Sequence, residues 1–229
     1  YSLESSKKGI ELTEKYDYIY TTSGISPNDV KESIEKTQKD IDELKKLIIE
    51  YKRGKKEKDK LVGIGEIGLD YYWNKENKEV QKYAFIEQIK LANEMNLPIA
   101  IHTREAVMDT LEILKQNPVN KKGVFHCCPF NRELVKEALK LSFYISIAGP
   151  VTFKNSKNAP EIIDMIPIDR MLIETDSPYL APEPVRGTRN TPSNVKFVAQ
   201  KIADVKGLTL ENVEKITFEN TKRILKMSF

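Results

Sequence analysis

The stretch "LVGIGEIGLD" (residues 61–70) predicts a buried β-strand. Its nearly continuous apolar residues are typical of a parallel strand that is covered on both faces. Residues 78–95 follow with apolar side chains at helical spacing, and "LPIAIHTR" (97–104) is a second apolar strand. A strand, a helix and a strand in this order predict two parallel strands joined by a crossover helix.

The same alternation continues on both sides of this unit. Further strands are expected at 18–25, 123–127, 143–149 and 170–176. Further helices are expected at 29–51, 105–116, 131–141, 159–166, 193–206 and 209–227. Alternation through the chain predicts an α/β fold with a parallel sheet and helices outside it. A length of 229 residues suits one domain over 1–229, since α/β barrels span roughly 200–250 residues without splitting.

Composition excludes some classes of protein. Hydrophobic residues make up 40% of the chain, which suffices for a core, and no apolar run approaches the length of a membrane span. The only cysteines, Cys127 and Cys128, are adjacent, which argues against a disulfide scaffold and favours a reducing compartment. The cytoplasm is the expected location, with the nucleus or secretion as alternatives because the start of the protein is expected to be missing. A net charge of +3 does not by itself indicate nucleic-acid binding. The basic run at 51–60 is either a DNA-contacting loop or, more commonly for such runs, a solvated connector.

Polar residues collect at the expected carboxyl ends of four strands. Glu66 is expected to end the strand "LVGIGE", and His102, His126 and Asp176 are expected to end three others. In a barrel of parallel strands these ends face one mouth, where active sites lie. The four side chains are therefore expected to converge.

Two imidazoles and two carboxylates form a mixed nitrogen and oxygen set suited to a divalent metal. A single buried histidine is more often a hydrogen-bonded core residue. Here, however, both histidines of the chain occupy expected strand ends. A buried carboxylate also needs a partner, because an unpaired charge costs several kcal/mol, and a metal supplies that partner.

Several motifs in order resemble the TatD family of metal-dependent deoxyribonucleases, over nearly the whole chain. The motifs are "GEIGLDYY" (65–72), "IHTREA" (101–106), "FHC" (125–127), "VTFKN" (151–155), "ETDSPYLAP" (174–182) and "RGTRNTP" (186–192). The resemblance implies a TIM-like (β/α)8 barrel. It also implies DNA as the substrate, hydrolysed at its phosphodiester bonds from the 3′ end, and two divalent ions. Mg²⁺ is expected, with Mn²⁺ or Zn²⁺ as alternatives.

The resemblance also assigns roles to the four polar residues. Glu66 matches the shared metal ligand, and His102 and His126 match the two imidazole ligands. Asp176 matches the acid that binds metal and handles the proton of the attacking water. Glu66 and Asp176 are thus the expected catalytic residues.

Residues in the matched motifs are candidates for substrate contact. They are Arg104, Tyr71, Arg186, Arg189 and Asn190. The two arginines after the last strand lie where barrels commonly bind phosphate and are suited to forked hydrogen bonds with phosphate oxygens; surface solubility is the alternative. Tyr71 and Tyr72 either stack on an unpaired base or pack over a barrel end.

The chain departs from the family pattern in three places. It has no His-x-His strand, so the first one or two strands of the barrel are expected to be missing and the metal set to be incomplete. Ser26-Pro27-Asn28 stands where the family often has His-Pro-His, which puts an acid role there in doubt. Cys128 and Pro129 follow "FHC" in place of an aromatic and a Ser-Gly turn, and Cys128 is either a ligand or, more commonly, a small buried residue.

Two other functions stay open at this point. One is a metal-dependent hydrolase of the same superfamily that acts on an ester or an amide. The other is a degenerate, non-catalytic member that binds DNA or a partner. For the leading hypothesis we expect a monomer with no membrane attachment and no obligate protein partner.

Overall fold

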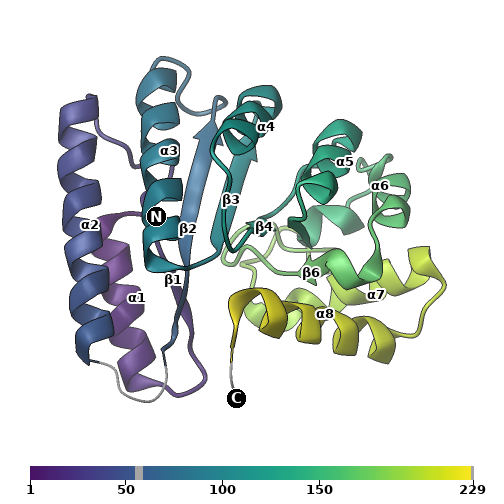
Figure 1. Ribbon diagram of the computed structural model, residues 1–229. Coiled ribbons are helices and arrows are strands. Elements are labelled where there is room, and N and C mark those ends of the chain that lie inside the picture. Colours follow the sequence, from purple (N-terminus) through teal and green to yellow (C-terminus); the bar gives the residue numbers. More distant parts are fainter. Residues whose placement is uncertain (55–58, 228–229) are drawn as a thin grey trace. The chain divides into compact units, whose positions relative to one another are not determined.

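The computed structural model describes residues 1–54 and 59–227, and it divides into two compact units (Figure 1). The first unit is Tyr1–Val124, completed by the chain from Ile224 onward, and the second is Phe125–Arg223. Within the described residues no helix combines the length and the apolar character needed to cross a membrane. The expectation of a single domain stays a prediction.

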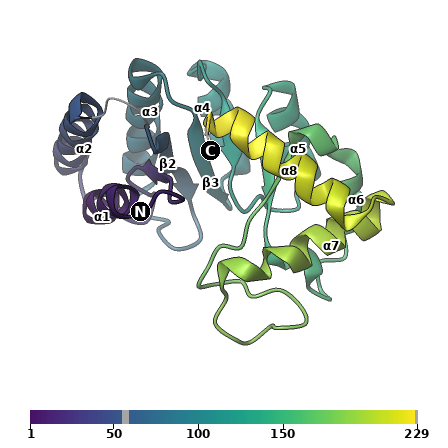
Figure 2. The ribbon, with the colours of Figure 1, turned by 90° about the horizontal axis from the view of Figure 1, so that it is seen from below.

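In the first unit, the parallel strands β1 (Thr21–Ser23), β2 (Leu61–Asp70) and β3 (Ile99–Arg104) pair in this order. Its helices are α1 (Leu3–Lys15), α2 (Ile34–Gly54), α3 (Lys78–Met95) and α4 (Val107–Gln116). Both ribbon views show α1, α2 and α3 side by side (Figures 1 and 2), with α3 packed against β2. β4 (Gly123–Phe125) lies where the two units meet in the sequence.

The second unit is built around β5 (Tyr144–Ile147) and β6 (Met171–Ile173), which pair in parallel. Its helices are α5 (Arg132–Lys140), α6 (Ala159–Met165), α7 (Val195–Lys206) and α8 (Leu210–Leu225). Three single 3₁₀ turns, η1 (Gly149–Thr152), η2 (Ile168–Arg170) and η3 (Pro192–Asn194), complete it. The α/β class and the parallel strands are therefore confirmed.

Some expected boundaries were wrong. β1 covers only Thr21–Ser23 of the expected 18–25, and Tyr18 is 75% exposed outside it. β6 ends at Ile173 rather than at 176, because the chain turns away after the Glu174 amide donates to the Ile147 carbonyl. Helix α1 was not expected, although Ser2 caps it by accepting the amide of Ser5.

Two buried glutamines on α3 fasten the helix to loops of the first unit. Gln88 accepts the Ile25 amide at 2.7 Å and donates to the Ile25 carbonyl at 2.9 Å. Two turns earlier on α3, Gln81 accepts the Asp70 amide at 2.8 Å and donates to the carbonyls of Asp70 and Asn74. Each amide thus satisfies buried backbone groups that the parallel strands leave unpaired.

Asn220 connects the last helix with the rest of the second unit. It lies on α8 and is 1% exposed. Its side-chain amide donates to the carbonyls of Ile168 and Met171, each at 2.8 Å. Asn220 therefore ties α8 to the start of β6.

The basic run at 51–60 lies partly outside the described residues, namely at 55–58. Of the described part, residues 51–54 belong to α2. Lys60 is 7% exposed, and its ammonium donates to the carbonyls of Thr13 and Tyr16 and to the Asp17 carboxylate. Lys60 is thus a buried structural cation rather than part of a solvated connector.

We predict that Gln88→Leu destabilises the protein because it leaves the buried Ile25 amide and carbonyl without partners. Each orphaned group costs about 1–3 kcal/mol. Urea unfolding followed by circular dichroism measures the free energy of unfolding. The matched control is Gln200→Leu on α7, where the exposed amide donates to Asp204 and the change is expected to stay below about 0.5 kcal/mol. Equal effects of the two variants would contradict the prediction.

Candidate metal and substrate site

Glu66 lies inside β2 and not at its end, which corrects the sequence-based expectation. Ile64 pairs with Ile99 and Ile67 pairs with Ile101, so β2 has one residue more than β3 between these pairs. Glu66 belongs to this irregularity. A bulge of this kind redirects a side chain and is common next to active sites.

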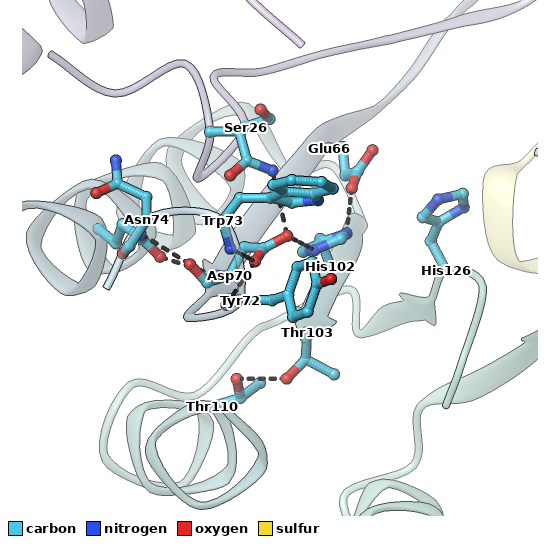
Figure 3. Close-up of polar contacts among 12 residues, drawn as sticks. Ser26, Glu66, Asp70, Tyr72, Trp73, Asn74, His102, Thr103, Thr110 and His126 are labelled. Carbon is cyan, nitrogen blue, oxygen red and sulfur yellow. Dashed lines mark hydrogen bonds and ion pairs between the residues drawn. The ribbon is translucent and has the colours of Figure 1, made fainter. Parts of the chain in front are cut away.

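The redirected carboxylate contacts one of the two histidines. His102 Nδ1 lies 2.6 Å from Oε1 of Glu66, and His102 Nε2 lies 2.9 Å from Oδ2 of Asp70 (Figure 3). The backbones of β2 and β3 approach closely here: a Cβ at Gly68 would lie 2.0 Å from the His102 carbonyl oxygen, and Gly68 has φ +138°. Glu66 and Asp70 thus contact the two imidazole nitrogens of His102, one each.

Asp70, which the sequence analysis did not single out, organises this region. It is 1% exposed and ends β2. Besides His102, its carboxylate accepts the Asn28 amide at 3.2 Å and the backbone amides of Tyr72 and Trp73 at 2.9 and 3.0 Å. Burial by itself would raise the pKa of Asp70, but these donors outweigh it and hold the pKa below its ordinary value.

The two carboxylates also determine the state of His102. Burial opposes its charged form, but the contacts with Asp70 and Glu66 outweigh burial and raise the pKa of His102. In the neutral ring, donation from Nε2 to Asp70 leaves Nδ1 with a free lone pair beside Glu66. A carboxylate that fixes one nitrogen while the other faces a ligand site is the usual environment of a metal-binding histidine. The donor set of Glu66 and His102 therefore fits a divalent metal.

The second unit contains a similar arrangement. His126 and Asp176 both lie beyond strands, after β4 and β6 respectively, and not at their last residues as expected. His126 Nδ1 lies 2.5 Å from Oε2 of Glu174, and His126 Nε2 lies 3.4 Å from Oδ1 of Asp176. His126 is thus also placed between two carboxylates, one of which is an expected metal ligand.

Glu174 holds His126 as Asp70 holds His102. Its other oxygen accepts the Cys127 amide at 2.6 Å. Burial would raise the pKa of Glu174, but His126, Ser146 and the Cys127 amide lower it below its ordinary value. Sequence reasoning missed both positioning acids, although each lies in a motif that was quoted, "GEIGLDYY" and "ETDSPYLAP".

The expected ligands occur as one pair in each unit, Glu66 with His102 and His126 with Asp176. In residues 1–54 and 59–227, no group of three or more His, Cys, Asp or Glu side chains is arranged to hold a metal ion. The convergence of all four residues stays a prediction.

The expected substrate residues of the first unit differ in exposure. Tyr71 is 7% exposed, and its hydroxyl donates to Asp109 at 2.7 Å. Burial and this carboxylate raise the pKa of Tyr71. Arg104 is exposed, with its guanidinium 4.0 Å from the ring centre of Tyr72. Packing therefore accounts for Tyr71, whereas Tyr72 and Arg104 are available to a ligand.

The expected substrate residues of the second unit lie in the segment after β6. Arg186 and Arg189 are exposed, and the Arg186 guanidinium lies 3.6 Å from the ring centre of Phe153. Asn190, in contrast, is 2% exposed, and its amide donates to the carbonyls of Thr175 and Tyr179, each at 2.7 Å. These contacts occupy both amide hydrogens, so Asn190 holds the loop in shape.

Cys128 is buried at 5% exposure, and burial raises the pKa of its thiol. A thiol must lose its proton to bind a metal. The environment therefore favours the interpretation of Cys128 as a small buried residue.

The parallel strands and the helices that cover them define the class of the protein, a TIM-like α/β fold. The chain belongs to the family of TatD related DNases, whose family model matches residues 1–226.

The curated relatives are named for a broader activity, metal-dependent hydrolysis. The chain is 44% identical to the "uncharacterized metal-dependent hydrolase YabD" of Bacillus subtilis, over 96% of this chain and 83% of that protein. It is 37% identical to the metal-dependent hydrolase YcfH of Escherichia coli K12, over 93% of this chain and 76% of that protein.

Solved structures confirm the fold. The TatD homologue YJJV of Escherichia coli K12 superposes with a TM-score of 0.88 at 23% identity, over 99% of this chain and 84% of that one. A TatD family hydrolase of Entamoeba histolytica superposes with a TM-score of 0.82 at 25% identity, over 98% of this chain and 82% of that one.

We predict that Asp109→Asn destabilises the protein at neutral pH only. Hydrogen bonds from Lys82 and then Tyr71 lower the pKa of Asp109 below its ordinary value. A depressed carboxyl pKa stabilises the folded state above the unfolded pKa of about 3.9, and the contribution is lost as the pH falls through the folded pKa. Thermal melts should therefore show a lower Tm for the variant at pH 7 and a difference in Tm that shrinks as the pH falls through the folded pKa of Asp109.

The control for this prediction is Asp204→Asn, an exposed carboxylate on α7 that contacts Gln200. Its Tm should follow that of the unmodified protein at both pH values. A deficit of Asp109→Asn that is as large at pH 3 as at pH 7 would show that the charge of Asp109 is not the cause.

Proposed function

We propose that this protein is a divalent-metal-dependent deoxyribonuclease that hydrolyses DNA phosphodiester bonds, with 3′ to 5′ exonuclease polarity. Membership of the TatD related DNase family supports the reaction class, and the relatives named as metal-dependent hydrolases support the need for metal. We further propose a cytoplasmic monomer and Mg²⁺ as the metal, two ions being the number that the family resemblance implies.

The observation that carries the proposal is the pair of imidazoles, each placed between a ligand carboxylate and a positioning carboxylate. In the first unit, Asp70 fixes Nε2 of His102 and leaves Nδ1 beside Glu66. In the second, Glu174 fixes Nδ1 of His126 and leaves Nε2 toward Asp176. Glu66, His102, His126 and Asp176 are therefore the proposed metal ligands.

Bound divalent ions would supply Lewis acidity at the phosphate and lower the pKa of a water molecule. The residues of the chain have separate tasks. Asp176 accepts the proton of the attacking water, since a carboxylate within reach of that water can act as a general base. Glu66 and His102 would bind a metal ion in the first unit, and His126 would bind one in the second. Asp70 and Glu174 keep the imidazoles in the orientation that ligation needs.

The exposed arginines of the second unit are the proposed phosphate contacts. Arg186 and Arg189 lie on a loop whose shape Asn190 holds by its hydrogen bonds to Thr175 and Tyr179. A guanidinium donates two parallel hydrogen bonds to phosphate oxygens, which orients the bond to be broken as well as attracting it.

We predict that Glu66→Ala and Asp176→Ala each abolish Mg²⁺-dependent release of nucleotides from single-stranded DNA. Each removes a negative ligand, and Asp176→Ala also removes the proton acceptor. Release of labelled nucleotides from a 5′-labelled and a 3′-labelled oligonucleotide measures both the rate and the polarity. Glu35→Ala is the control, because this carboxylate is 83% exposed on α2 and its ion pair with Lys39 lies on the surface. Undiminished turnover in either ligand variant would reject the site.

A panel of substrates separates this reaction from its alternatives. Chromogenic carboxylic esters and amides, assayed with the same metal, test a hydrolase that does not act on phosphate. If the protein hydrolyses these esters or amides but not DNA, DNA is rejected as its substrate. Absence of turnover on the whole panel would favour a non-catalytic member.

We predict that Asp70→Asn weakens binding of Mn²⁺ about 10–100-fold, as is usual when the partner of a metal-binding histidine is lost. Isothermal titration calorimetry measures the affinity directly, without reference to turnover. Circular dichroism establishes that the variant is folded. Asp204→Asn serves again as a control on an exposed carboxylate. An unchanged affinity in folded Asp70→Asn would remove Asp70 from the site.

A further inference from the structure

We propose that Trp73, together with Tyr72 and Arg104, forms a stacking platform for an unpaired base of single-stranded DNA. The inference rests on the proposed deoxyribonuclease function and specifies the form of DNA that this site takes. The sequence already suggested Arg104 as a substrate contact and stacking on a base as one role for Tyr72, but it did not point to Trp73.

The platform consists of two neighbouring aromatic residues that face solvent. Trp73 is 69% exposed and Tyr72 is 44% exposed. Their ring centres lie 4.8 Å apart at an interplanar angle of 87°, so the two rings meet edge to face. Edge-to-face contact is a favourable arrangement for two aromatic rings, and it restrains the orientation of both side chains. The large exposed fraction of Trp73 leaves much of its indole surface available to a ligand.

Arg104, at the end of β3, adds a positive charge to the two rings. Its guanidinium lies 4.0 Å from the centre of Tyr72 and 5.6 Å from the centre of Trp73. Stacking on an aromatic ring restrains the long side chain while leaving its N–H groups able to donate. An aromatic face beside a fixed cation suits one nucleotide, because the base can stack on the ring while the negative phosphate lies near the guanidinium.

The backbone that carries the two rings is held firmly. Oδ1 of Asp70 accepts the amides of both Tyr72 and Trp73, and Gln81 donates to the Asn74 carbonyl at 3.0 Å. Figure 3 shows Tyr72 and Trp73 close to Asp70 and His102. Oδ2 of the same carboxylate contacts His102, so the turn that carries the two rings lies next to this proposed metal ligand. Binding therefore needs little ordering of the turn, which favours affinity.

The chemistry of the platform selects unpaired bases with little regard to sequence. Every base offers a π-face, and stacking on an aromatic side chain contributes about 1–3 kcal/mol per base. A base inside a duplex has both faces covered by its neighbours, so it cannot stack on Trp73 without being unpaired and extruded, which is unfavourable. Single strands and frayed ends are therefore the expected ligands.

Trp73 is the only tryptophan of the chain, so its fluorescence reports on the platform directly. The experiment titrates an eight-residue oligothymidylate into the protein in EDTA, where hydrolysis is prevented. The matched ligand is an abasic oligonucleotide of the same length and charge. We expect saturable quenching by the first and none by the second. Equal quenching by both, or none by either, would overturn stacking on Trp73.

A second measurement uses a fluorescein-labelled oligothymidylate and its anisotropy. Trp73→Leu should weaken binding about 5–150-fold, which is the loss of 1–3 kcal/mol expressed as a ratio. Trp73→Phe keeps an aromatic face and should retain most of the affinity. Tyr18→Leu is the control, because Tyr18 is also an exposed aromatic residue of the first unit, at 75% exposure. Unchanged affinity in Trp73→Leu would overturn the proposal.

Turnover of the same oligonucleotide with Mg²⁺ separates this inference from the proposed function. For the platform we expect Trp73→Leu to raise KM and to leave kcat nearly unchanged. Hydrolysis with an unaltered KM would reject the platform and leave the nuclease proposal standing. Base-dependent quenching without any hydrolysis would support the platform as a DNA-binding surface and reject the nuclease proposal.

Discussion

The buried carboxylate of Asp70 is the constraint on which the first unit depends. A charged group with 1% exposure is costly unless it is hydrogen-bonded, and Asp70 has four donors. These donors come from three places in the sequence: Asn28, the turn at Tyr72 and Trp73, and His102 on β3. Satisfying one buried charge therefore fixes the relative positions of a loop, a turn and a strand.

Glu174 has the corresponding task in the second unit, where it holds His126 and the backbone of Cys127. In both units the positioning acid contacts one imidazole nitrogen and leaves the other toward a candidate ligand, Glu66 or Asp176. The nitrogen that is fixed differs, Nε2 in His102 and Nδ1 in His126. The two histidines therefore present different atoms to a metal, and the positioning acids determine which atom it is.

The same hydrogen bonds connect the candidate metal ligands with substrate recognition. Asp70 holds His102 with one oxygen and the Tyr72–Trp73 turn with the other. A rigid turn next to a ligand would place an unpaired base at a fixed distance from the reacting phosphate, and such positioning is a large part of catalysis. Loops that carry function on a rigid scaffold are usual in α/β proteins.

Much of the fold was predictable from local patterns. The bounds of α3 agree with the sequence analysis and β2 covers the quoted apolar run, because a regular helical stripe and a long apolar run are signals that depend on near neighbours. The expectation that this strand ends at Glu66 was wrong, since β2 continues to Asp70. The short strands β1 and β6 were expected to be longer, since their ends are decided by hydrogen bonds with distant carbonyls. Helix α1, whose signal is a cap formed by two serines, was missed.

The sequence by itself determined the alternation of strands and helices, the family and the identity of four candidate metal ligands. Only the tertiary structure decided that Glu66 lies in a bulge inside β2, that Asn190 and Tyr71 are buried among their own partners, and that Trp73 is exposed. It also revealed Asp70 and Glu174 as positioning acids. The reason is physical: a side chain's type is written in the sequence, but its burial and its hydrogen-bond partners depend on segments far away along the chain.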